Sequence, residues 1–127
     1  AYPGWLYRFT ATSCGITSAR IVKRIRYCNS HHGGYETNVG VKDFIIQGTN
    51  NAAAFANLTY ADDTNWTTIA TDVSTMVQHT EGYDGVIWNT INLTNDTAYK
   101  YYAIKCANNH GDGNNIGLRR VVFKKLV

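Results

Sequence analysis

The clearest local signal in this chain is a stretch that reads Val41-Lys42-Asp43-Phe44-Ile45-Ile46-Gln47-Gly48-Thr49-Asn50. Its centre is a run of aromatic and β-branched residues, and its end is a cluster of turn-forming residues. A run of this length with these boundaries is typical of a β-strand and is too short for a helix. We therefore predict a strand over Val41–Gln47.

Runs of the same kind recur along the chain, separated by Gly, Asn, Asp and Ser, and none keeps a helical apolar period. The segment Thr49–Asn65, which contains Ala52-Ala53-Ala54, has room for a single helical turn. Strands joined by long polar loops predict an all-β fold, a sandwich or jelly roll. The other predicted strands are Trp5–Phe9, Ala19–Tyr27, Trp66–Ala70, Val86–Leu93, Tyr99–Ala107 and Leu118–Lys125.

The predicted strand Ala19–Tyr27 has an alternating pattern that indicates which residues face each side of the sheet. In a strand, successive side chains point to opposite sides of the sheet. We expect Ile21, Ile25 and Tyr27 on one face, and Val22, Arg24 and Arg26 on the other.

Composition sets the size and class of the protein. The chain has 127 residues, of which 44% are hydrophobic and 17% are charged, so residues 1–127 are predicted to form one domain. We expect this domain to be part of a larger protein or assembly. The net charge of +3 comes from dispersed basic residues, which is too mild to indicate nucleic acid as a partner. No apolar run approaches the roughly 18 residues of a transmembrane segment, and the N-terminus has no leader pattern.

The three cysteines are Cys14, Cys28 and Cys106. Their number permits at most one intrachain disulfide, and their spacing does not match a zinc site. The pairing stays open, and we interpret them as core or near-surface thiols.

The stretch 41–50 resembles the "K-D-F-x-(I/L)-x-G-S-N" stretch of discoidin domains, also called coagulation-factor C-type domains, which are akin to family 32 carbohydrate-binding modules. Further segments resemble the motifs of that family in the same order over nearly the whole chain. They are Trp5-Leu6-Tyr7-Arg8-Phe9, Asn65-Trp66-Thr67-Thr68-Ile69, the segments 95–102 and 109–118, and Val121-Val122-Phe123.

The resemblance implies an eight-stranded, galactose-binding-like jelly-roll β-sandwich that binds glycans, lipid headgroups or proteins through loops at one end and is not catalytic. Two departures are visible. We expect the segment that precedes the Trp strand in the family to be absent, and Leu118-Arg119-Arg120-Val121 stands where the family has a calcium-binding Glu. Since Arg cannot ligate a cation that requires oxygen donors, we predict no calcium site and no cofactor. The second departure is the insertion Asn51–Asp63, which stands where many relatives have a short turn and is similar to those of discoidin-like modules in phage tail and other virion proteins.

The loop Asn29–Asn38 is the first candidate binding site, because the matching loop of sugar-binding relatives supplies His and Asn side chains. We predict sugar contacts from His31, His32 and Asn38, and ring stacking by Tyr35. The alternative is an exposed polar turn. Two adjacent His residues rarely hold a metal without a third ligand, so no metal site is predicted.

The loop 108–115 is the second candidate, with Asn109 and His110 as ligand-binding residues. Its alternative is a turn rich in Asn and Gly. Two groups of basic residues could bind an anionic partner, although we favour their interpretation as solvated strand faces. These groups are Arg20, Lys23, Arg24 and Arg26, and Arg119, Arg120, Lys124 and Lys125.

The sequence thus predicts a non-catalytic carbohydrate-binding or surface-adhesion module, extracellular or on a virion, whose partner is a glycan on a cell or polymer surface. No nucleophile motif and no Gly-rich helix-opening loop indicates an enzyme. The alternative from another class is a structural or decoration module with a protein partner or a homo-oligomer. A third alternative is a binder of nucleic acid or another acidic polymer.

Overall fold

The computed structural model describes residues 4–10 and 18–125. It contains seven strands, one short helix and one 3-10 turn, and every predicted strand and the predicted helical turn are confirmed with small shifts of their ends. The elements are β1 (Trp5–Thr10), β2 (Val22–Asn29), η1 (Thr37–Val39), β3 (Phe44–Thr49), α1 (Ala52–Ala56), β4 (Thr67–Thr71), β5 (Asn89–Thr94), β6 (Tyr101–Cys106) and β7 (Leu118–Lys125).

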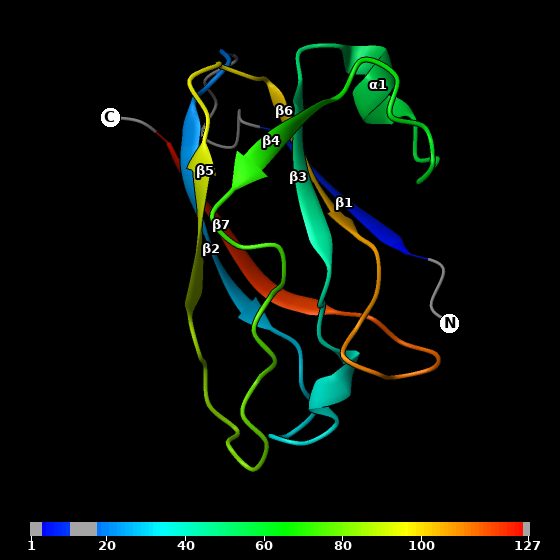
Figure 1. The fold of residues 1–127 in the computed structure, drawn as a ribbon, viewed down its shortest axis with the longest axis vertical. Helices are drawn as coiled ribbons and strands as arrows, with labels where there is room; N and C mark the ends of the chain where they lie inside the picture. The colour runs from blue at the N-terminus through cyan, green and yellow to red at the C-terminus, as the bar shows by residue number, and fades with distance from the viewer. Residues whose placement is uncertain (1–3, 11–17, 126–127) are drawn as a thin grey trace.

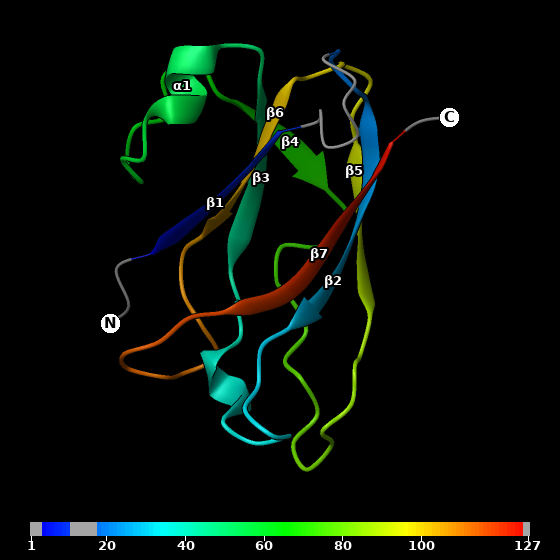
Figure 2. The same ribbon diagram turned by 180° about the vertical axis from the view of Figure 1, so that it is seen from behind.

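The strands form an antiparallel sheet in the order β1-β6-β3-β4-β5-β2-β7 (Figure 1). Between β4 and β5 the pairing is reduced to Ala70↔Thr94 and Thr71↔Leu93, so the sheet turns a corner there. The result is two facing layers, β1-β6-β3-β4 and β5-β2-β7, which are also visible from behind (Figure 2). The predicted all-β sandwich is confirmed.

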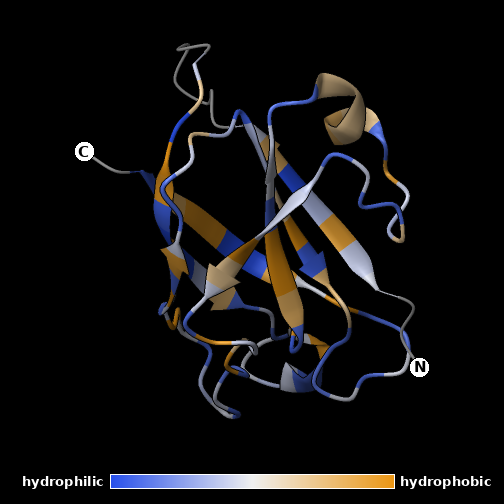
Figure 3. Ribbon diagram, turned by 45° about the horizontal axis from the view of Figure 1, so that its top comes forward, coloured by the Kyte–Doolittle hydropathy of each residue, from blue (hydrophilic) through white to orange (hydrophobic). Residues whose placement is uncertain are grey.

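The core lies between the two layers. One layer contributes Ile46 and Ile104, the other contributes Ile25 and Ile91, and all four are fully buried. Hydrophobic and hydrophilic bands alternate along the strands in Figure 3, as expected when one face of each strand enters the core. In the described part of the chain no helix has the length and apolar character needed to cross a membrane.

Val22 departs from the predicted alternation of β2. The prediction placed it on the outer face, but its side chain is only 3% exposed and belongs to the core. The pairing of β2 with β7 shifts register between Val22 and Arg24, so Lys23 is an extra residue that inverts the alternation.

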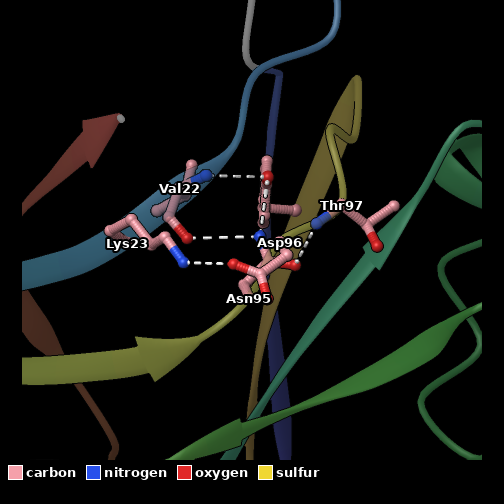
Figure 4. A network of polar contacts seen from close by, with 6 residues as sticks. Val22, Lys23, Asn95, Asp96 and Thr97 are labelled. Carbon is pink, nitrogen blue, oxygen red and sulfur yellow. Dashed lines mark hydrogen bonds and ion pairs between the residues drawn. The ribbon is translucent and has the colours of Figure 1, made fainter. Parts of the chain in front are cut away.

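Hydrogen bonds hold this irregular segment in place (Figure 4). The buried Asn95 donates to the carbonyl of Val22 at 3.2 Å, and the Val22 N–H donates to the Tyr102 hydroxyl at 3.2 Å. Lys23 reaches outward to Asp96 at 2.7 Å. The bulge is therefore stabilised by contacts from the loop that follows β5 and from Tyr102 on β6.

The insertion between β3 and β4 covers the outer face of β1, β6 and β3. Lys105 on β6 forms a 2.9 Å ion pair with Asp63 of the insertion, and the buried amide of Gln47 donates to the same carboxylate oxygen at 3.0 Å. The ring of Tyr60 lies over the Lys105 ammonium, and the Arg8 guanidinium donates to the carbonyl of Phe55 at 3.1 Å. Strand β6 is consequently buried on both faces.

Candidate functional site

Three connections meet at one end of the sandwich, at the bottom of Figure 1. We call this surface, made of residues 30–43, 72–88 and 107–117, the loop end. Backbone hydrogen bonds join the three connections into one unit, since each connection is bonded to another. These bonds are Gly117 N–H to Val39 O at 2.9 Å, Met76 N–H to Lys42 O at 2.8 Å and Gly82 N–H to Gly34 O at 2.7 Å.

Asn29, the last residue of β2, anchors the loop end and is only 2% exposed. Its amide nitrogen donates to the carbonyls of Val41 at 2.8 Å and Val77 at 3.0 Å. Its amide oxygen accepts the N–H groups of Val41 at 2.8 Å and Ser30 at 3.0 Å. One side chain at the end of β2 therefore holds two connections, 30–43 and 72–88, to the sheet.

His31 lies beneath the surface of the loop end rather than on it. Its ring stacks on the ring of His79, with a centroid separation of 3.7 Å. Its Nδ1 accepts the N–H of Gly34 at 2.9 Å, and its Nε2 lies 2.9 Å from the guanidinium of Arg119. Both ring nitrogens thus face groups of the protein itself. His31 therefore supports the structure of the loop end instead of presenting its ring to a ligand.

The stack continues outward from His79 to Tyr83. The two rings are nearly parallel, 15° apart, with a centroid separation of 6.1 Å, and His79 Nε2 also lies 2.5 Å from the Tyr83 carbonyl. The Tyr83 ring lies over Gly85, where a Cβ would come within 2.2 Å of it. We call His31, His79 and Tyr83 the ring ladder; its outermost ring is 52% exposed.

Tyr35 is displayed by a turn that adjoins the ring ladder, and its side chain is 59% exposed. Two backbone hydrogen bonds between His32 and Tyr35, of 2.7 and 2.9 Å, close this turn. Gly34 has a φ of +81° and lies so close to the Tyr83 backbone that a Cβ would be 2.9 Å from its carbonyl carbon. A glycine at this position allows the two tyrosines to stand on adjoining turns.

The four other predicted site residues differ in their exposure and in their contacts within the protein. His32 is exposed and lies 3.3 Å from Glu36, and Asn38 is half-buried, with its carbonyl accepting the Asp112 N–H at 3.4 Å. The amide nitrogen of Asn109 donates to the carbonyls of Asp112 and Asn115, both at 2.6 Å, while the ring of His110 lies 2.9 Å from the carbonyl of Met76. Asn109 therefore organises the loop that contains it, and His110 attaches that loop to the connection 72–88.

Sequence reasoning missed Asn29, His79 and Tyr83 as site residues. His79 and Tyr83 lie in the connection 72–88, which has no recognisable motif, and their only sequence signal is a His followed four positions later by a Tyr and then by Gly85. In the sequence, Asn29 is the first residue of the candidate loop Asn29–Asn38 and has no signal of its own. Its role depends on Val41 and Val77, which are distant in sequence.

The titratable groups of the described residues offer no reactive thiol. Cys28 and Cys106 are free and buried, and burial raises the pKa of the Cys106 thiol to about 12. Burial also raises the pKa of Cys28. Cys14 lies outside the described residues. Among the residues described, no three His, Cys, Asp or Glu side chains gather in a way that could hold a metal ion.

No protein-family model matches this chain. A comparison with curated proteins likewise finds no match. The discoidin resemblance therefore stays a prediction from the sequence motifs. The structure confirms the coarser expectation drawn from it, an all-β sandwich.

The buried position of His31 predicts a loss of stability on mild acidification. Burial lowers the pKa of His31, the charges of His79 and Arg119 lower it further, and Asp84 acts in the opposite direction. The unfolded chain then binds this proton more readily than the folded chain, so the free energy of unfolding falls as the pH drops below about 6.5. We expect the melting temperature to fall between about pH 7.5 and pH 5.5.

The variants His31→Gln and His32→Gln test this prediction in thermal melts over the same pH range. His31→Gln is expected to flatten the profile, whereas His32→Gln removes the exposed neighbouring imidazole and is expected to leave it unchanged. The aspartates with lowered pKa, such as Asp63 and Asp112, act only below about pH 4 and do not interfere. An unchanged slope in His31→Gln would assign the acid sensitivity to another group.

Proposed function

We propose that this chain is a non-catalytic carbohydrate-binding module that recognises glycans through the loop end. The observation that carries the proposal is the pair of exposed tyrosines, Tyr35 and Tyr83, on adjoining turns. An exposed aromatic ring packs well against the C–H face of a pyranose. The buried rings of His31 and His79 behind Tyr83 support its orientation.

Polar side chains around the two tyrosines provide partners for sugar hydroxyl groups. Asp84 and Glu36 are largely exposed carboxylates, and His32 is an exposed imidazole. Such a site is shallow, so we expect weak binding by a single copy and avidity on a multimer. A module of this kind would act outside the cell or on a virion surface, where glycans are displayed.

The test is a glycan array probed with the protein tetramerised on streptavidin. Relative to wild type, Tyr83→Ala is expected to weaken binding to the best glycan about fivefold, since ring stacking contributes about 1 kcal/mol. Tyr83→Phe keeps the ring and is expected to retain most of the binding. Leu58→Ala, which removes an exposed apolar side chain from the distant insertion, serves as the control.

Two outcomes would contradict the proposal. One is the absence of any bound glycan with the wild-type tetramer. The other is a Tyr83→Ala variant that remains folded and binds as wild type does.

A second function, a structural module that contacts protein, is favoured by the connection between β4 and β5. This connection carries several exposed apolar side chains, which is the composition of a contact surface. A stable oligomer in light-scattering measurements, lost on replacing these side chains by serine, would favour this function. The side chains are Val73, Val77, Val86 and Trp88.

A further inference from the structure

We propose that the outer face of the β5-β2-β7 layer is a second binding surface, which holds an anionic polysaccharide. This inference goes beyond glycan recognition at the loop end and uses none of its residues. The surface, which we call the basic face, consists of Arg24 and Arg26 on β2 and of Arg120 and Lys124 on β7. Strands β2 and β7 are antiparallel neighbours at the edge of this layer (Figure 2).

The register of β2 and β7 places these cations together. Ile25 and Tyr27 point into the core. Because successive side chains of a strand point to opposite faces, Arg24 and Arg26 point outward. Lys124 stands directly opposite Arg24. Residues two apart on a strand are about 7 Å apart, and neighbouring strands are about 5 Å apart. The basic face is therefore a compact array of positive charge.

This arrangement is unfavourable for the isolated protein. Like charges directly opposite each other on antiparallel strands destabilise the sheet. Within residues 4–10 and 18–125, carboxylates pair with Lys23, Lys105, His31 and His32, but none forms an ion pair with the basic face. Asp72, beside β5, accepts two 2.9 Å hydrogen bonds from Asn92 with its two oxygens. An anionic partner would supply the missing counter-charge.

The side chains beside the cations favour a polysaccharide over a nucleic acid. Single-stranded nucleic acids bind to free aromatic ring faces on which their bases stack. The Arg26 guanidinium lies over the ring of Trp88, 4.9 Å from its centroid, and so occupies a face of that ring. On β5, Thr90 opposite Arg26 instead offers a hydroxyl group, and Asn92 opposite Arg24 offers its amide oxygen, and both groups suit sugar hydroxyls.

The experiment measures heparin binding by biolayer interferometry, with neutral dextran as the negative probe. We compare Arg24→Gln/Lys124→Gln with Arg20→Gln/Lys100→Gln, a control that removes the same charge at two positions outside both the basic face and the loop end. At about 50 mM NaCl we expect wild type to bind heparin but not dextran, and the basic-face variant to bind roughly tenfold more weakly. The slope of log Kd against log salt is expected to fall by roughly half in that variant.

The control variant is expected to stay within about twofold of wild type, since its two cations lie outside the proposed contact. Thermal melts check the fold, and removal of opposed like charges is expected to leave the melting temperature unchanged or raise it. Equal losses in both variants would overturn the proposal, because net charge alone would then explain binding. Absence of heparin binding would overturn it as well, and so would equally tight binding of a single-stranded oligonucleotide.

The two proposals can be tested independently of each other. Tyr83→Ala is expected to keep heparin binding, and Arg24→Gln/Lys124→Gln is expected to keep its pattern on the glycan array. Loss of heparin binding in Tyr83→Ala would assign that binding to the loop end and overturn the second site.

Discussion

Replacing Asn29 by alanine is expected to lower the free energy of unfolding by about 3 kcal/mol. The change removes four hydrogen bonds and leaves the N–H and C=O of Val41, a fully buried residue, without their partners. A buried polar group that loses its partner costs more than the net value of the bond. Urea denaturation followed by tryptophan fluorescence measures the loss.

Two further variants separate hydrogen bonding from packing at this position. Asn29→Asp keeps the acceptor oxygen but loses the donors to Val41 and Val77, and we expect it to be destabilised as well. Asn114→Ala, at an exposed position in the loop end, is expected to change stability by less than about 0.5 kcal/mol. A nearly neutral Asn29→Ala would show that water can replace the side chain and that the loop end does not depend on it.

The second large effect is expected from Asp63→Asn, which we predict to lower the free energy of unfolding by about 2 kcal/mol. Lys105 is buried beneath the insertion, and its charge is compensated by Asp63 at 2.9 Å. The asparagine oxygen can still accept from the Gln47 amide, but it is neutral, so that hydrogen bond is no longer charge-assisted. Denaturation curves give the stability, and limited proteolysis within residues 50–66 reports whether the insertion has loosened.

The double variant Asp63→Asn/Lys105→Met is the matched control, because it removes the buried charge together with its partner. We expect it to recover much of the lost stability, as buried ion pairs can often be replaced by apolar groups.

The hydrogen bond from Gln47, then that from Lys105, holds the pKa of Asp63 below its ordinary value. This carboxylate therefore stabilises the fold above about pH 4, and the contribution is lost on further acidification. Full stability in Asp63→Asn would contradict the role of the pair.

The strands were predictable because their signal is local. The alternation of apolar and polar residues, interrupted by glycine and asparagine, is a property of neighbouring residues and indicated all seven strands. The error at Val22 has the opposite cause. The extra residue Lys23 exists only relative to the pairing with β7, and the bulge is held by Asn95 and Tyr102 from later in the chain. No local pattern contains that information.

The candidate site was predictable only in part, since its residues come from connections far apart in the sequence. Tyr35 was predicted from its loop and is exposed, whereas His31 from the same loop is buried. The difference arises because His79, from another connection, stacks on His31 and covers it. Tyr83 also belongs to the site only because its connection packs against the loop that contains His31 and Tyr35.

The sequence by itself determined the fold class, the strand positions and the loops that carry polar and aromatic residues. Each of these follows from short-range preferences of the backbone and from the need to bury one face of each strand. Only the tertiary structure decided which connections meet, which histidine is buried, and that Arg24 stands opposite Lys124. The physical reason is that strand pairing and register are set by contacts between distant segments, whose free energy no local pattern records.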